Sequence, residues 1–116
     1  MGLEANVVYM EEEIANVKER IEAIQNFLLA NPSVSIYRRS IKGRIYYYKK
    51  YRRGSKSISK FLGSGNLNIM KISKEINSEN RKIKKAKMQL AILKYQMVAL
   101  NKQARIARKA LENARA

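Results

Sequence analysis

The sequence predicts a mainly helical fold with a small β element: a long antiparallel coiled-coil helical hairpin that carries a three-stranded antiparallel β-meander at its tip. Three observations lead to this prediction. Apolar residues follow a heptad pattern over residues 3–30 and again over 66–115, and the segment between them is basic, rich in tyrosine and interrupted by turn glycines. We treat residues 1–116 as a single domain.

The first heptad pattern predicts a helix over residues 3–30. Its apolar residues recur alternately four and three positions apart, as in a coiled-coil seam. Asn31-Pro32 ends the helix, because proline disfavours helix at the preceding residue and has no backbone N–H. The seam residues are Leu3, Val7, Met10, Ile14, Val17, Ile21, Ile24 and Leu28.

Residues 33–63 predict the meander. Two-residue turns at Lys42-Gly43 and Arg53-Gly54 suit hairpins, because glycine takes a positive φ at no steric cost. Side chains alternate along strands, so counting outward from the turns assigns two faces, which a one-residue change in either turn would exchange. The predicted core face carries Val34, Ile36, Ile45, Tyr47, Tyr51, Ile58 and Leu62, together with Arg38, Lys49, Lys56 and Lys60.

The other face is predicted to be an aromatic row with cations between the rings. On it Tyr37 is expected opposite Tyr48, and Tyr46 opposite Phe61. Residues 33–63 hold ten Lys/Arg and no Asp or Glu. Cations that alternate with aromatic residues favour a surface on which the cations bind phosphates and the rings stack on bases. The predicted nucleic-acid-binding residues are Tyr37, Arg38, Arg39, Lys42, Arg44, Tyr46, Tyr48, Lys50, Arg52, Arg53, Lys56 and Lys60.

The second heptad pattern predicts one helix over 66–115, with Asn66 as its N-cap and Glu79 as the only interruption of its seam. If the helices fold back with Leu28 near Ile69 and Leu3 near residue 94, residues 95–116 have no intramolecular partner. We therefore expect a homodimer or higher homo-oligomer. The predicted oligomerisation residues are Met97, Leu100, Ala104, Ala107 and Leu111.

The same register would place Glu11, Glu12 and Glu13 beside Lys84, Lys85 and Lys87. Each exposed ion pair is worth at most about 1 kcal/mol. The basic run of the second helix would then be largely neutralised, so we rank it below the meander as a nucleic-acid contact.

The formal net charge of +16 predicts a polyanionic partner, with nucleic acid, either DNA or RNA, as the first choice. The chain has no His and no Cys, and Glu11, Glu12 and Glu13 point to different sides of their helix, so we expect no enzyme activity, no metal and no cofactor. No apolar run approaches the ~20 residues of a membrane span, and we expect no membrane partner and a cytoplasmic location.

Two other functions remain open. One is a protein-binding module from a phage or mobile element, an inhibitor that docks on a host protein or a ribonucleoprotein. Tyrosine anchors would serve such an interface, and its binding would resist salt better than phosphate contacts do. The other is a structural coiled-coil protein whose basic charge only assists assembly.

The strand segment carries a family resemblance. Its aromatic strand is followed by Tyr51-Arg52, Gly54, Lys56 and a terminal Leu62-Gly63. This pattern resembles the hairpin signature of small prokaryotic proteins, many carried by phages, plasmids and archaea, in which helices flank the hairpin. The resemblance implies the architecture and no particular activity. The segment also resembles the three-stranded arm-binding modules of tyrosine recombinases, where a basic sheet enters a DNA groove.

Overall fold

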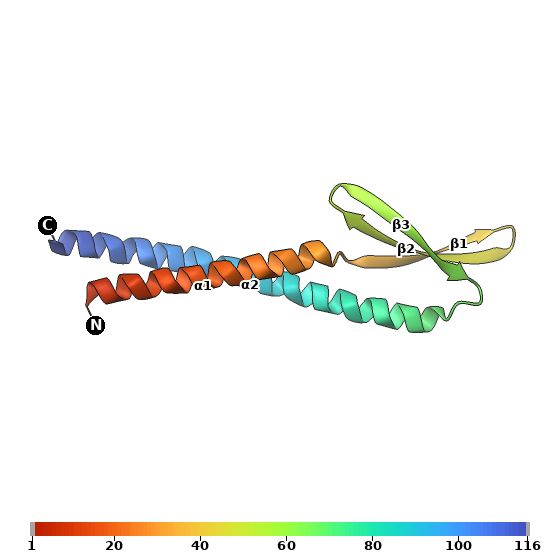
Figure 1. The fold of residues 1–116 in the computed structure, drawn as a ribbon, viewed down its shortest axis with the longest axis horizontal. Coiled ribbons are helices and arrows are strands. Elements are labelled where there is room, and N and C mark those ends of the chain that lie inside the picture. The colour runs from red at the N-terminus through yellow and green to blue at the C-terminus, as the bar shows by residue number, and fades with distance from the viewer. Residues whose placement is uncertain (1, 116) are drawn as a thin grey trace. The chain divides into compact units, whose positions relative to one another are not determined.

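The computed structural model describes residues 2–115 (Figure 1). The elements in chain order are α1 (Leu3–Ala30), β1 (Val34–Ile41), β2 (Arg44–Arg53), β3 (Lys56–Ser64) and α2 (Ile69–Arg115). The predicted fold class is confirmed: two long helices form the arms of a helical hairpin, and a three-stranded antiparallel meander connects them in the chain.

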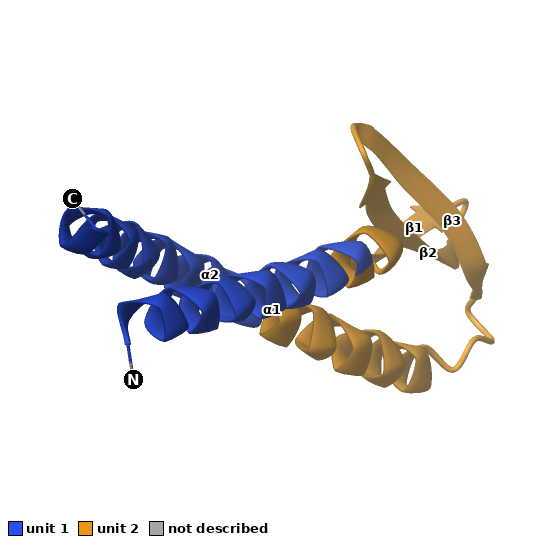
Figure 2. Ribbon diagram, turned by 60° about the vertical axis from the view of Figure 1, so that its left-hand side comes forward, with its two compact units in different colours: residues 1–26, 87–116 blue, residues 27–86 orange. Residues whose placement is uncertain are grey.

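The chain forms two compact units, coloured separately in Figure 2. The helical unit combines the chain up to Asn26 with the chain from Lys87 onward, and the sheet unit comprises Phe27–Ala86. Both helices run through the boundary, so the sheet unit includes the last turn of α1 and residues 69–86 of α2.

The core of the helical unit is the predicted heptad seam. Val7 and Val17 of α1 and Leu93 and Ala104 of α2 are buried, and Ala104 has no exposed surface. The small alanine allows the two helices to approach closely at this point. Each of these residues is a seam position of its helix, so the two predicted seams are confirmed as the surfaces on which the helices pack.

Two ion pairs show that α1 and α2 are antiparallel in the helical unit. The Arg108 guanidinium donates to Glu11 Oε1 from Nη2 at 3.0 Å and from Nε at 3.1 Å. The Arg115 guanidinium donates to Glu4 Oε1. These pairs lie seven residues apart on each helix, which is two turns, so they describe one continuous register.

The predicted register was therefore wrong. Leu3 was expected near residue 94, whereas its neighbour Glu4 bonds Arg115, about 20 residues further along α2. The end of α1 was expected near Ile69, whereas Ala30 lines a pocket together with Ile83. The physical reason is that residues 75–83 of α2 line a pocket together with Lys49, Tyr51 and Arg53 of β2, so this part of α2 has the sheet as a neighbour and α1 pairs with the part of α2 beyond it.

In this register α1 packs along the C-terminal part of α2. That part of α2 therefore does not lack an intramolecular partner, which was the basis for predicting an oligomer. The predicted oligomerisation residues face the interior of the helical unit: Ala104 is buried, and the other four are half-buried. A homo-oligomer remains a prediction, but it cannot use this seam while α1 occupies it. The four half-buried residues are Met97, Leu100, Ala107 and Leu111.

The first hairpin has the predicted turn. Ile41 pairs with Arg44, and Lys42 and Gly43 have φ angles of 51° and 78°. Two successive positive φ values are typical of a type I′ turn, whose twist matches the flanking strands. The predicted pairing of Tyr37 with Tyr48 is confirmed, although these residues lie four pairs away from the turn.

The second hairpin turns one residue later than predicted. Arg53 pairs with Lys56, so the turn is Gly54-Ser55 rather than Arg53-Gly54. Gly54 has φ 65° at the first central position, as in a type II′ turn. The register shifts by two residues, which keeps every side chain on its predicted face but places Tyr48, not Tyr46, opposite Phe61.

A β-bulge near the end of β3 leads the chain toward α2. Tyr48 pairs with Phe61 and Tyr47 with Gly63, so Leu62 is the extra residue. Gly63 has φ 158°, and a Cβ added there would lie 3.2 Å from Leu67 Cδ1. A larger residue at this position would therefore strain the backbone and crowd the Leu67 side chain.

The first turn of α2 is capped by Asn68, whose Oδ1 accepts the Lys71 backbone N–H at 3.3 Å. The predicted N-cap, Asn66, was wrong by two residues. Further along α2, the seam passes through Asn80, which is half-buried, and not through Glu79, which is exposed. Glu79 instead pairs with Lys82 at 3.1 Å along the helix surface.

Asn80 joins α2 to the start of the sheet. The Val34 backbone N–H donates to Asn80 Oδ1 at 3.0 Å, and Asn80 Nδ2 donates to the Val34 carbonyl oxygen at 2.7 Å. One side-chain amide thus satisfies both backbone groups of the first residue of β1, in the way that a neighbouring strand would.

Candidate nucleic-acid interface

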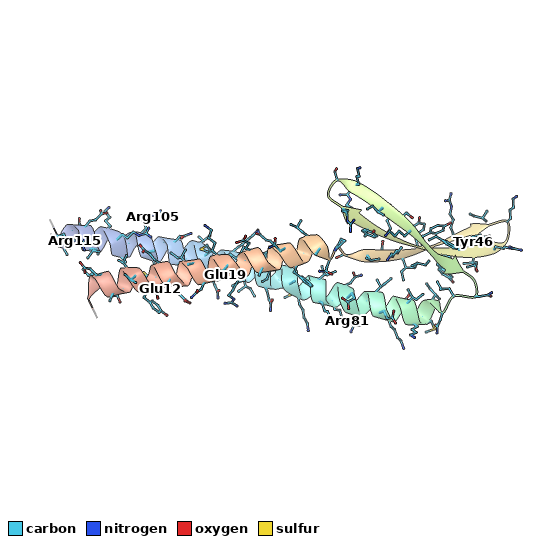
Figure 3. The ribbon with its side chains drawn as sticks, in the orientation of Figure 1. Glu12, Glu19, Tyr46, Arg81, Arg105 and Arg115 are labelled. Atoms are coloured by element: carbon cyan, nitrogen blue, oxygen red, sulfur yellow. The ribbon has the colours of Figure 1, made fainter. Side chains whose placement is uncertain are left out.

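Four aromatic rings from three strands form one cluster on the predicted aromatic face. We call Tyr37, Tyr46, Tyr48 and Phe61 the aromatic cluster. Tyr48 is at its centre: its ring stacks on Tyr37 at a centroid distance of 5.2 Å and meets the edge of Phe61 at 5.6 Å. Tyr46, labelled in Figure 3, is tilted against Phe61 at 6.2 Å. The cross-strand pairs hold each ring in position.

The members of the aromatic cluster on the two edge strands, β1 and β3, are the more exposed. Phe61 is 58% exposed and Tyr37 is 37% exposed, whereas Tyr46 and Tyr48 are half-buried by their neighbours. Sequence reasoning placed Phe61 on this face but left it out of the predicted site. The signal was present in the sequence, because Phe61 was expected opposite Tyr46 on this face, and the structure adds its pairing with Tyr48.

A hydroxyl-lined hollow lies beside the cluster. It is lined by Ser35, Ser57 and Ser59 together with Tyr37 and Lys50. The Tyr37 hydroxyl and the Ser59 hydroxyl share a hydrogen bond of 2.5 Å. Hydroxyl donors next to an ammonium group are suited to a phosphate oxygen, while the neighbouring rings are suited to a base.

Four cations share the face with the aromatic cluster. Arg39, Arg44, Lys50 and Arg52 are exposed, and their positions in the strand register put them on the same side as Tyr48. Within residues 2–115, every ion pair is formed by side chains of the helices, so the structure gives these four no anionic partner. Seven of the predicted residues are thus brought together: Tyr37, Arg39, Arg44, Tyr46, Tyr48, Lys50 and Arg52.

The structure does not bring the other predicted residues to this face. Arg38, Arg53, Lys56 and Lys60 are on the opposite face of the sheet, and Lys42 is in the first turn. The predicted site is therefore divided between two faces.

The opposite face has a different character. It borders an open pocket of about 330 Å³, which is lined by Lys49, Tyr51 and Arg53 of β2 and by Glu75 and Glu79 of α2. The Lys60 ammonium lies 5.9 Å from the centroid of the Tyr51 ring. Two acids of α2 thus lie near this side of the sheet, and Lys60 makes a cation–π contact on it. Tyr47 and Tyr51, the predicted core tyrosines, lie on this face and are half-buried.

The basic run of α2 is not neutralised as predicted. Glu11 bonds Arg108, in a register that moves the acids of α1 away from Lys84, Lys85 and Lys87. Within the described residues, Lys82 is the only member of this run with an ion pair, to Glu79 of the same helix. The reason for ranking this run below the sheet is therefore removed. The run comprises Arg81, Lys82, Lys84, Lys85 and Lys87.

Residues 2–115 contain no group of three or more His, Cys, Asp or Glu side chains that is arranged to hold a metal ion. None of the helices in this range is long and apolar enough to cross a membrane. Comparison of the chain with protein-family models, with curated proteins and with solved structures gave no match.

Proposed function

We propose that the protein binds nucleic acid without catalysing a reaction, and that the aromatic face of the sheet is its contact surface. The observation that carries this proposal is the aromatic cluster surrounded by four cations on one sheet face. Rings that present a π-face stack on any base, and cations beside them hold the backbone. Phe61 and Tyr37 have the most accessible rings for stacking, and Lys50 with the serine hydroxyls is placed to hold a phosphate.

The salt dependence of binding tests this proposal. Engagement of about five to eight phosphates gives a slope of log K against log salt near −4 to −7. Arg39, Arg44 and Lys50 replaced together by Gln should weaken binding and make the slope shallower by up to about 3, because each lost phosphate contact removes roughly 0.9. The assay is a fluorescence titration of a labelled oligonucleotide at several salt concentrations.

The sheet supplies a matched control. Arg38, Arg53 and Lys56 replaced by Gln remove the same charge from the opposite face, and we expect a smaller loss of affinity and a smaller change in slope. Equal effects of the two triple variants would show that only total charge matters, which contradicts a defined contact face. Failure of the wild type to bind DNA or RNA in low salt would reject the function and favour a protein partner.

A further inference from the structure

Four exposed apolar residues of the helical unit belong to a second heptad pattern on α2. Met88, Ile92, Tyr95 and Ile106 are between 57% and 80% exposed. With the exposed Ala99, Lys102 and Lys109 they recur alternately four and three residues apart, on the side of α2 opposite the seam that packs on α1. A helix that is apolar on two opposite sides has a second packing surface. We call these seven residues the outer face of α2.

The outer side of α1 has a complementary pattern of exposed residues. They also recur alternately three and four residues apart, and they combine small or apolar side chains with acids. Figure 3 shows Glu12, one of these acids, on the side of α1 away from α2. Glu12 and Glu19 are seven residues apart, as are Lys102 and Lys109 on the outer face of α2. We define the outer face of α1 as Ala5, Val8, Glu12, Ala15, Glu19, Glu22 and Asn26.

We infer that a second copy of this chain docks the outer face of its α1, antiparallel, on the outer face of α2. In this arrangement Glu12 meets Lys109 and Glu19 meets Lys102. Between these two charged layers Ile106 meets Ala15, and a large side chain opposite a small one lets the helices approach closely. The two patterns remain in step along the pair, because each alternates steps of three and four residues in the order that an antiparallel partner requires.

Charge selects α1 of the second copy over its α2. The described part of α2 in the helical unit, residues 87–115, has seven bases and one acid, whereas residues 3–26 have six acids and two bases. Two α2 helices would therefore repel, while α1 and α2 attract. The intramolecular ion pairs use Glu4 and Glu11, so Glu12 and Glu19 are available to another copy.

This interface joins two different surfaces, so each copy retains one free face of each kind. Head-to-tail contacts of this sort build a ring or an open chain of copies instead of stopping at a dimer. Each copy carries one basic sheet, so assembly would multiply the contacts with a long polyanion. The inference does not depend on the proposed function, because it concerns the protein free of nucleic acid.

Charge reversal on each face provides the test, by sedimentation velocity on nucleic-acid-free protein. The weight-average mass of the wild type should rise with concentration beyond that of a dimer. Glu12→Lys/Glu19→Lys and Lys102→Glu/Lys109→Glu should each lower the association constant about tenfold or more, since attraction becomes repulsion at two positions. An equimolar mixture of the two variants should associate again, because every reversed face meets a reversed partner.

Two further variants complete the test. Lys87→Glu/Lys94→Glu reverses two exposed lysines of α2 that also lie seven residues apart but outside its outer face. This control changes the net charge as much as the Lys102 and Lys109 reversals do and should associate like the wild type. Tyr95→Ser/Ile106→Ser removes two exposed apolar anchors without changing charge and should associate as weakly as the reversed variants.

Three outcomes would overturn the inference. The first is a wild type that remains monomeric at all concentrations. The second is a mixture of the two reversed variants that fails to associate. The third is a loss of association caused by the lysine reversals but not by the glutamate reversals, which would indicate contact between two α2 helices.

Discussion

Asn80 shows how one residue can set the position of an edge strand. Its amide bonds both the N–H and the carbonyl oxygen of Val34, so these groups point away from β2 and toward α2. An edge strand otherwise presents such groups to any other strand that comes near. The sequence offered a weak signal, an asparagine next to the break at Glu79, but a strict alternation of steps of three and four residues puts the seam at position 79. Asn80 takes this place in the structure because β1 lies opposite it.

Replacement of Asn80 by Ala should destabilise the sheet unit. Two hydrogen bonds are lost and a backbone pair is left without its partner, which costs about 1–3 kcal/mol. Thermal unfolding measures the loss, and faster amide hydrogen exchange at Val34 locates it. Asn77→Ala, an exposed asparagine of the same helix, is the control and should be nearly neutral. Equal melting temperatures for the two variants would contradict a linking role for Asn80.

At the scale of elements, local patterns were sufficient to predict the helices, the strands and the two faces of the sheet. Heptad spacing and Asn31-Pro32 defined α1, because period and helix ends are properties of neighbouring residues. The second turn was misplaced by one residue, since Arg53-Gly54 and Gly54-Ser55 both put glycine at a permitted turn position. The assignment of side chains to the two faces was still correct, because that error shifts the register between β2 and β3 by two residues. The aromatic pairing across β2 and β3 was predicted incorrectly, because Phe61 pairs with Tyr48 and not with Tyr46.

The two faces of the sheet should separate in a paired measurement of affinity and stability. Phe61→Ala removes the most exposed ring of the aromatic cluster and should cost about 1–3 kcal/mol of single-strand binding with little change in melting temperature. Tyr51→Ala should do the reverse. Its loss of stability should be less than the roughly 3–5 kcal/mol of a fully buried aromatic, because Tyr51 is half-buried. If Tyr51→Ala weakens binding while Phe61→Ala does not, the contact face is the opposite one.

At the scale of the whole molecule, the pairing of α1 with α2 could not be derived from the sequence. Both seams repeat every seven residues, so a shift of whole heptads leaves apolar residues facing each other. The charges do not remove this ambiguity, since α2 has bases along most of its length and Glu11 can meet Lys87 or Arg108 with equal ease. The alternatives differ in what covers the first turns of α2, and that depends on the sheet. The register of α1 on α2, which depends on this long-range packing, determines where the acids of α1 lie and which basic residues of α2 remain free.

A cross-linking experiment distinguishes the two registers. The chain has no cysteine, so Glu11→Cys/Arg108→Cys introduces the only two thiols. Their side chains are in contact in the structure, and a short bis-maleimide should join them within one chain. Glu11→Cys/Lys87→Cys matches the register predicted from the sequence and should not react within one chain, because Lys87 lies 21 residues from Arg108, about 30 Å along α2.

Mass spectrometry of digests from dilute protein separates intramolecular from intermolecular products. The loss of one exposed ion pair costs at most about 1 kcal/mol, so both variants should keep the fold. Efficient intramolecular cross-linking of the Lys87 pair alone would restore the predicted register and leave the C-terminal seam of α2 free for another chain.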